Sequence, residues 1–256
     1  MLNRIIVIAK NTFRETLRDR ILLSVVVVML LLIGFSLFAG SISLGQEDRM
    51  IVDFGLTAIY ILQIFVAIFM GSMLIYKEIE RKTFFLIIPK PIRREEIILG
   101  KCLGLLATTL VVTLLSLCVL FALLALRGVH GFYLSIMLSA LLSLLEALLI
   151  ILVSILLSGL TSPILSAVYT GAFFLIGHSG EMLRTLIDTN QSTFSGYALK
   201  AAYYLLPNLE KFNIRNDVVY GAFPDMHMLS LALLYALLYG SLLFLLARSM
   251  FAHKEF

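Results

Sequence analysis

The chain has 256 residues, of which 61% are hydrophobic and only 14% are charged, and its mean hydropathy is +1.02. About half of the residues of an ordinary soluble domain are apolar, so this composition excludes one and indicates an integral membrane protein. The isoelectric point of about 9.1 would suggest a nucleic-acid partner in a soluble protein. In a membrane protein an excess of basic residues is typical of loops that face anionic lipid, so no nucleic acid is expected.

Residues 1–20 come first and show two faces at helical spacing. The apolar face carries Ile6, Ala9, Phe13 and Leu17, and the basic face carries Lys10, Arg14 and Arg18. This pattern predicts an amphipathic helix that lies in the membrane interface. A cleaved signal peptide is the alternative, but the flank is long for one and the following apolar run at 21–38 exceeds the usual core. We therefore expect a retained first span.

Six apolar runs follow this helix, and a helix needs about 20 apolar residues to cross a bilayer. They lie at about 21–38, 54–76, 103–126, 133–160, 162–177 and 229–247. The alternating strands of a membrane barrel are absent from the sequence, so the spans must be helical. The sequence predicts an all-α integral membrane protein with six transmembrane helices in one domain, residues 1–256. The fifth run is the shortest and begins near Pro163.

Residues 77–101 form the only long polar segment between apolar runs on the basic side. They contain seven of the chain's Lys and Arg residues and four Glu, and Pro89 and Pro91 interrupt any single helix. With six spans, this segment shares one side with both termini, and that side carries fourteen Lys and Arg against six on the other. The positive-inside rule therefore predicts cytoplasmic termini and a cytoplasmic segment 77–101. A solvated loop that only obeys membrane topology is the alternative.

The long segment 178–228 is predicted to lie on the opposite side. Its residues 197–206 are apolar and aromatic before Pro207. Such a stretch is typical of a short interfacial helix or of a re-entrant hairpin packed among the spans. Both forms stay open at this point.

Glu146 is the one carboxylate deep in an apolar run. An ionisable group there is costly, which makes it a candidate for a functional site. Ser139 and Ser143 precede it at helical spacing on the same face, so these three residues are candidates for a translocation path. The alternative is a structural hydrogen bond to another helix, with Gln63, Thr109 or Thr113 as partner. We expect Glu146→Gln to have little effect, because the sequence offers no second ionisable group for a proton relay.

Enzymatic motifs are weak in this sequence. Residues 177–180 match the G-x-S-G string of rhomboid-type intramembrane proteases, but no histidine lies in the sixth run to act as base, so no catalytic residue is expected. The H-E-x-x-H pattern is missing, so no metal site is expected. Gly100-Lys101 is not a phosphate-binding loop, because Glu95 and Cys102 replace the required Gly and Ser or Thr. No cofactor is expected, and ATP hydrolysis would need a separate chain.

The segment 77–101 also carries a resemblance to a known family. It contains Glu78, Glu80 and Thr83 in an E-x-E-x-x-T string, then Pro89, Arg93 and Gly100-Lys101. This combination resembles type-2 ATP-binding-cassette (ABC) transporter permeases, in which it forms the end of the second span, the coupling helix and the start of the third span. The subgroup it resembles most is the one of multicopper-enzyme and nitrous-oxide-reductase maturation permeases, from which we carry over no copper function. Lys82 departs from the pattern, since many members have Gly there.

The resemblance implies a permease that exports a substrate across the cytoplasmic (inner) membrane of a bacterium, driven by a separate ABC ATP-binding subunit. It implies a second permease copy, as a homodimer or heterodimer, and a connecting helix that contains Lys10, Arg14 and Arg18. The implied ATPase-coupling residues are Glu78, Glu80, Arg81, Thr83, Pro89, Arg93 and Lys101. The alternative function is an ATP-independent secondary transporter or channel that uses the polar stripe at Glu146.

Overall fold

A computed structural model of the chain describes residues 2–42, 46–74, 94–129, 131, 133–189, 200, 203, 207–223 and 225–252. Every element in these ranges is helical, and none of the described residues forms a strand. The all-α class is thus confirmed.

Five of the described helices are long and apolar enough to cross a membrane. They are α2 (Arg20–Ile42), α3 (Glu47–Phe65) with its continuation to Leu74, α6 (Arg94–Leu126), α7 (Tyr133–Ser158) and α12 (Met226–Ala252). The remaining predicted span corresponds to α8 (Pro163–Gly177), whose 15 residues reach only roughly 22 Å. A sixth complete helical crossing therefore stays a prediction.

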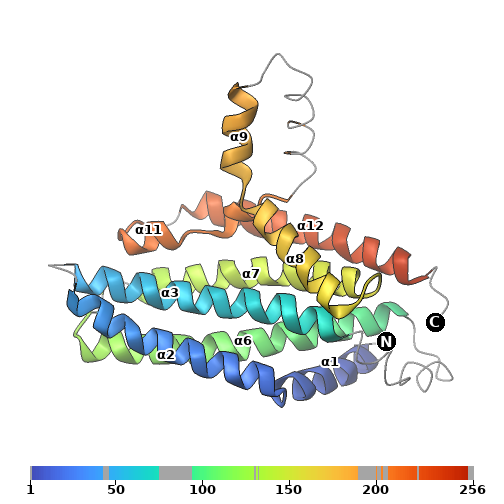
Figure 1. The fold of residues 1–256 in the computed structure, drawn as a ribbon, viewed down its shortest axis with the longest axis horizontal. Helices are drawn as coiled ribbons and strands as arrows, with labels where there is room; N and C mark the ends of the chain where they lie inside the picture. The colour runs from blue at the N-terminus through green and yellow to red at the C-terminus, as the bar shows by residue number, and fades with distance from the viewer. Residues whose placement is uncertain are drawn as a thin grey trace.

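The five long helices run side by side along the long axis of the molecule, and α7 is at the centre (Figure 1). Helix α7 packs against α3, α6, α8 and α12. In its most apolar part 72% of the residues are buried, against 22% for α2 and 17% for α12. The side chains that decide function in a bundle of this kind must therefore be sought around α7.

Ion pairs mark the two ends of the bundle. At one end Arg127 and Glu47 lie 3.0 Å apart and join the end of α6 to the start of α3. We call this end of the bundle the Glu47 end. At the other, the Glu95 end, Glu95 is 2.9 Å from Arg248 near the end of α12. Arg4 of α1 is 3.9 Å from Glu96 at this same end, so the first and the last helix are both joined to the start of α6.

Between α7 and α12 the chain returns from the Glu95 end to the Glu47 end in two pieces. The first piece is helix α8. The second piece is residues 207–219, which contain the short helices η2 (Leu209–Phe212) and α11 (Arg215–Val219). Tyr220 lies under the guanidinium of Arg49, 5.9 Å from ring centroid to Cζ, which places this second piece at the Glu47 end. We call α8 and residues 207–219 together the split segment. Helix α9 (Gly180–Thr189) stands out from the bundle at the break (Figure 1).

Helix α1 (Leu2–Leu17) packs along the first part of α6. Its predicted basic residues Lys10, Arg14 and Arg18 are exposed. Of the predicted apolar face Ile6 is 54% exposed, and the side chains that α1 buries include Thr12 and Thr16. The side chains of α1 that face α6 are small because the two helices are in close contact at Gly104 of α6. A Cβ atom at Gly104 would lie 2.6 Å from the carbonyl oxygen of Ala9. The place of α1 in the membrane interface stays a prediction.

One turn of the second span is a π-helix, η1 (Val66–Met70). The hydroxyl of Ser154 in α7 donates to the carbonyl oxygens of this turn, to Ala67 at 3.0 Å and to Ile68 at 3.4 Å. The helices approach closely here, since a Cβ at Gly71 would lie 2.6 Å from the Cβ of Ser154. A hydroxyl of α7 thus binds the backbone of the irregular turn inside an apolar bundle.

Candidate functional site at the break in the split segment

Glu146 lies near the middle of the 26-residue helix α7 and is completely buried. Ser139 and Ser143, on the same face, are 2% and 5% exposed. The hydroxyl of Ser143 donates to the carbonyl oxygen of Ala140 at 3.0 Å, so it is satisfied within its own helix. The structure brings the three predicted path residues together on the inward face of α7.

The partners of Glu146 come from α3 and from the end of α8. The hydroxyl of Tyr60 donates to Glu146 Oε1 at 2.9 Å, and it lies 3.0 Å from Nε2 of His178. His178 Nε2 is in turn 3.4 Å from Glu146 Oε1. These three side chains join three separate elements at half the length of the bundle.

The predicted partners of Glu146 are wrong. Gln63 Nε2 donates instead to the hydroxyl of Thr113 at 3.0 Å and to the carbonyl oxygen of Ala140 at 3.3 Å. Thr109 donates to the carbonyl oxygen of Leu105 within its own helix. The amide of Gln63 thus joins α3 to a side chain of α6 and to the backbone of α7, and it makes no bond to the carboxylate.

His178 follows the last residue of α8 and is held on its other ring nitrogen. Nδ1 lies 3.1 Å from the carbonyl oxygen of Phe174, and the two rings pack with centroids 4.6 Å apart. Because a carbonyl oxygen only accepts hydrogen bonds, Nδ1 must be the donor in this pair. Nε2 is therefore the nitrogen that faces Tyr60 and Glu146.

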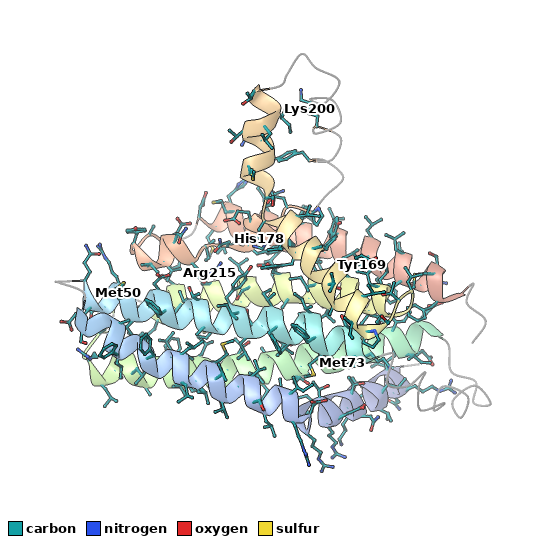
Figure 2. The ribbon with its side chains drawn as sticks, viewed as in Figure 1. Met50, Met73, Tyr169, His178, Lys200 and Arg215 are labelled. Atoms are coloured by element: carbon teal, nitrogen blue, oxygen red, sulfur yellow. The ribbon has the colours of Figure 1, made fainter. Side chains whose placement is uncertain are left out.

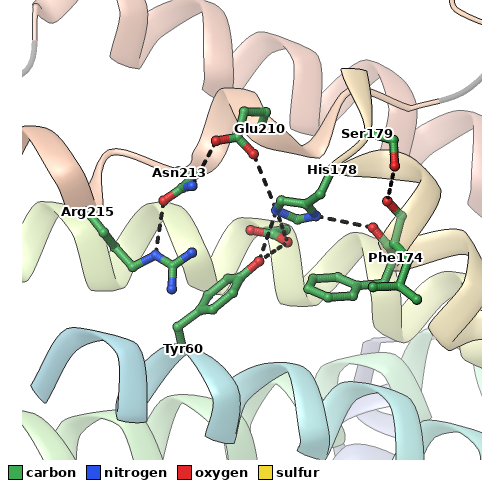
Figure 3. A network of polar contacts seen from close by, with 9 residues as sticks. Tyr60, Phe174, His178, Ser179, Glu210, Asn213 and Arg215 are labelled. Carbon is green, nitrogen blue, oxygen red and sulfur yellow. Dashed lines mark hydrogen bonds and ion pairs between the residues drawn. The ribbon is translucent and has the colours of Figure 1, made fainter. Parts of the chain in front are cut away.

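A second layer of polar residues comes from the other piece of the split segment. Glu210 Oε2 is 3.9 Å from His178 Nε2, and Glu210 Oε1 accepts a hydrogen bond of 2.8 Å from Asn213 Nδ2. Arg215 Nε donates to Asn213 Oδ1 at 3.0 Å. The guanidinium of Arg215 then lies over the ring of Tyr60, 3.7 Å from its centroid, which closes the network (Figure 3).

The break in the split segment lies between His178 and this second layer. Figure 2 shows Met50, Arg215, His178 and Met73 in this order along the long axis, with His178 near the middle. The side chain of His178 is 19% exposed and that of Glu210 is 39% exposed. Ionisable groups are thus reachable from outside the chain at the level where a lipid bilayer would have its apolar centre.

One oxygen in this network lacks a protein partner. Among the described residues, nothing donates a hydrogen bond to Glu146 Oε2, although this atom is buried. Burial of an unpaired carboxylate oxygen costs free energy, so an ionised Glu146 without a further partner is unfavourable in this site. The expectation that no second ionisable group accompanies Glu146 is wrong, because His178 is in contact with it.

Sequence reasoning missed Tyr60 and the polar residues of the second layer. It considered His178 only as part of the G-x-S-G string at 177–180. The signal that could have found the second layer is the placement of Glu210 and Arg215 close to the apolar stretch before Pro207, since charges beside a re-entrant segment need partners within the protein.

The residues predicted to couple to an ATPase are only partly described. Glu78, Glu80, Arg81, Thr83, Pro89 and Arg93 lie outside the described residues. Lys101 is 1% exposed, and its Nζ donates to the carbonyl oxygen of Leu74 at 3.2 Å. It joins the end of the second span to the start of the third.

Comparison with known families adds the decisive observation. The sequence model of the family described as ABC-2 family transporter protein matches residues 6–178. The chain belongs to this family. The protein is thus a multi-pass membrane permease of an ABC transporter, a transport subunit and not itself an enzyme.

The region matched to the ABC-2 family extends from α1 to His178. It includes Tyr60, Glu146 and His178, and it ends before Glu210 and Arg215. None of the curated proteins matches the chain. The family match does not reach a subgroup, so the resemblance of this ABC-2 permease to the maturation permeases stays a prediction.

Proposed function

We propose that this ABC-2 permease exports a substrate across the cytoplasmic membrane of a bacterium, driven by a separate ATP-binding subunit. The observation that carries the proposal is the family match over residues 6–178. The string of charged residues in segment 77–101 supports the partner, because it resembles the coupling element of type-2 permeases. ATP-independent transport, the alternative from the sequence, is disfavoured by membership in a family of ABC transporters.

The contacts at the Glu95 end support a role in coupling. Segment 77–101 connects α3 to α6, and Lys101 links these two helices through the carbonyl oxygen of Leu74. Ion pairs from Glu95 to Arg248 and from Glu96 to Arg4 attach α12 and α1 to the same place. A force on segment 77–101 would therefore move α1, α3, α6 and α12 together, as a rigid-body mechanism requires.

The exposed charges at the break support a second permease copy. His178 and Glu210 would meet hydrocarbon if the chain were alone, and charged groups at that depth are costly. A second copy on this side would enclose a polar path between the two chains. Ser139, Ser143 and Glu146 are buried, so they would line the path only after the helices around them move.

The coupling proposal predicts the effect of reversing charge in segment 77–101. Glu80→Lys and Arg81→Glu should each abolish stimulation of the ATP-binding subunit, because the polar contact between the chains would be replaced by repulsion. The measurement is the ATPase rate of the partner ATP-binding subunit, with each permease variant in lipid vesicles. Arg184→Glu, on exposed helix α9, is the matched control. Equal rates for wild type and for the two segment variants would remove the contact from this segment.

The proposed orientation predicts which positions react with a membrane-impermeant thiol reagent. In a variant without Cys102 and Cys118, Arg93→Cys and His253→Cys should react only from the cytoplasmic side. Glu47→Cys and Tyr220→Cys should react only from the outer side, since these residues lie at the opposite end of the bundle. Labelling of Tyr220→Cys from the cytoplasm would show that the split segment does not complete a crossing.

A further inference from the structure

The side chains around Glu146 carry one proton fewer than their hydrogen bonds can use. We propose that Tyr60, Glu146 and His178 form a binding site for a single proton, and that this proton fastens the end of α8 to α3 and α7. The proposal goes beyond the proposed function, because it assigns a ligand and a conformational role to the network at the break and needs no ATP-binding subunit.

Proton counting gives the first argument. Nδ1 of His178 holds its hydrogen against the carbonyl oxygen of Phe174, so the neutral ring presents a lone pair at Nε2. The Tyr60 hydroxyl has one hydrogen, and two acceptors compete for it, Glu146 Oε1 at 2.9 Å and His178 Nε2 at 3.0 Å. Only one of them can receive it at a time.

Without a further proton, the site contains an unfavourable contact. The lone pair of His178 Nε2 faces the carboxylate oxygen of Glu146 at 3.4 Å, and the other oxygen of this carboxylate has no partner among the described residues. One added proton changes this contact in either of two ways. On the carboxylate it gives a neutral acid beside an imidazole, and on Nε2 it gives an imidazolium beside a carboxylate. Both forms make the pair neutral overall.

The charges around the pair do not replace this proton. The charged groups that face it from the neighbouring elements are Glu210 of η2 and Arg215 of α11. Asn213 bridges these two side chains, so their opposite charges offset each other. The remaining negative charge of Glu146 is completely buried, and its burial is unfavourable unless it is neutralised.

The position of His178 gives the proton its conformational role. His178 ends α8, and through Glu210 it also contacts the other piece of the split segment. With the proton bound, the end of α8 is attracted to α3 and α7. Once the proton leaves at higher pH, two acceptors face each other and the end of α8 is released. Low pH therefore fastens the split segment, and high pH frees it.

The chain has no tryptophan, which allows a clean reporter. Phe174→Trp places the only indole beside His178, where the wild-type rings are 4.6 Å apart. In lipid nanodiscs, the fluorescence of this variant should show one transition with the steepness of a single proton as pH rises. Adding Glu146→Gln or His178→Gln should abolish the transition or shift its midpoint by about one pH unit or more.

Glu210→Gln is the matched control, because it removes a nearby charge and leaves the three-residue site intact. It should keep the transition and move its midpoint to lower pH, since a missing negative charge disfavours proton binding. A transition unchanged by both Glu146→Gln and His178→Gln, or no transition at all, would overturn the proposal.

A second measurement does not depend on any substitution at the site. Infrared difference spectra of the wild-type protein between low and high pH should contain the band of a buried protonated carboxyl or of an imidazolium. Glu146→Gln should remove the carboxyl band, and His178→Gln should remove the imidazolium band. A spectrum with neither band would overturn the proposal even if the variants fold poorly. Failure of ATPase coupling would leave both measurements unaffected.

Discussion

Gly104→Leu is expected to separate helix α1 from α6. A Cβ atom at this position would lie 2.6 Å from the carbonyl oxygen of Ala9 and 2.7 Å from the Cβ of Thr12. The first of these atoms belongs to the backbone of α1 and cannot turn away. Forced overpacking costs roughly 1–3 kcal/mol, and a leucine at a backbone contact should reach the top of this range.

The separation can be measured through a buried position of α1. Thr16→Cys, in a variant without the native cysteines, should be protected from a thiol reagent in the parent and reactive when Gly104→Leu is added. Gly34→Leu is the matched control, since no atom lies within 4 Å of a Cβ at this site. If Thr16→Cys stayed protected in the Gly104→Leu variant, the close packing of α1 on α6 would be disproved.

Gly71→Leu is expected to destabilise the contact between the second span and α7. A Cβ at this position would lie 2.6 Å from the Cβ of Ser154 and 3.1 Å from its hydroxyl oxygen. Displacing Ser154 also removes its hydrogen bond to the carbonyl oxygen of Ala67. The overpacking should cost roughly 1–3 kcal/mol. The loss of this hydrogen bond should add about 0.5–1.5 kcal/mol.

Thermal unfolding in detergent measures this loss as a lower midpoint for Gly71→Leu than for wild type. The matched control is Gly171→Leu on α8, where a Cβ meets no atom within 4 Å. Ser154→Ala should show the smaller loss that comes from the hydrogen bond alone. Similar midpoints for Gly71→Leu and Gly171→Leu would contradict the packing of η1 on α7.

Apolar runs predict the long helices well because the bilayer demands them. The run at 133–160 corresponds to α7, which ends at Ser158, and the run at 229–247 lies within α12. The run at 103–126 finds the end of α6 but not its start, since this helix begins at Arg94. The polar first turns of α6 are helical because their charged side chains have partners elsewhere in the protein. Glu95, for example, pairs with Arg248.

The split segment could not be derived in the same way. Its second piece contains charged residues and short helices, and local sequence does not tell such a stretch from an outer loop. Its place is decided by buried contacts such as that of Leu209, which approaches Gly177 so closely that a Cβ there would lie 2.6 Å away. Contacts of this kind depend on the packed bundle and leave no periodic signal.

The candidate site was predictable in one residue only. Helical spacing identifies Glu146 and its inward face, because a buried carboxylate stands out in an apolar run. Its partners Tyr60 and His178 lie in other elements, and they are 118 positions apart in sequence. Periodicity reports which face of a helix is buried, but it does not report which side chain of a neighbouring helix meets that face.

The π-turn at Val66–Met70 has a consequence for how the second span is compared with other sequences. Its outward side chains Phe54 and Ile61 are seven residues apart, but the next, Phe69, follows after eight. The π-turn takes up the additional residue, so the outward side chains stay on one face of the helix. Every residue after the turn points roughly 100° away from where it would point in a regular helix. An alignment without a gap to a relative that lacks this turn would pair each residue after Met70 with one that points roughly 100° away around the helix. The turn thus acts as a one-residue insertion contained within a single helix.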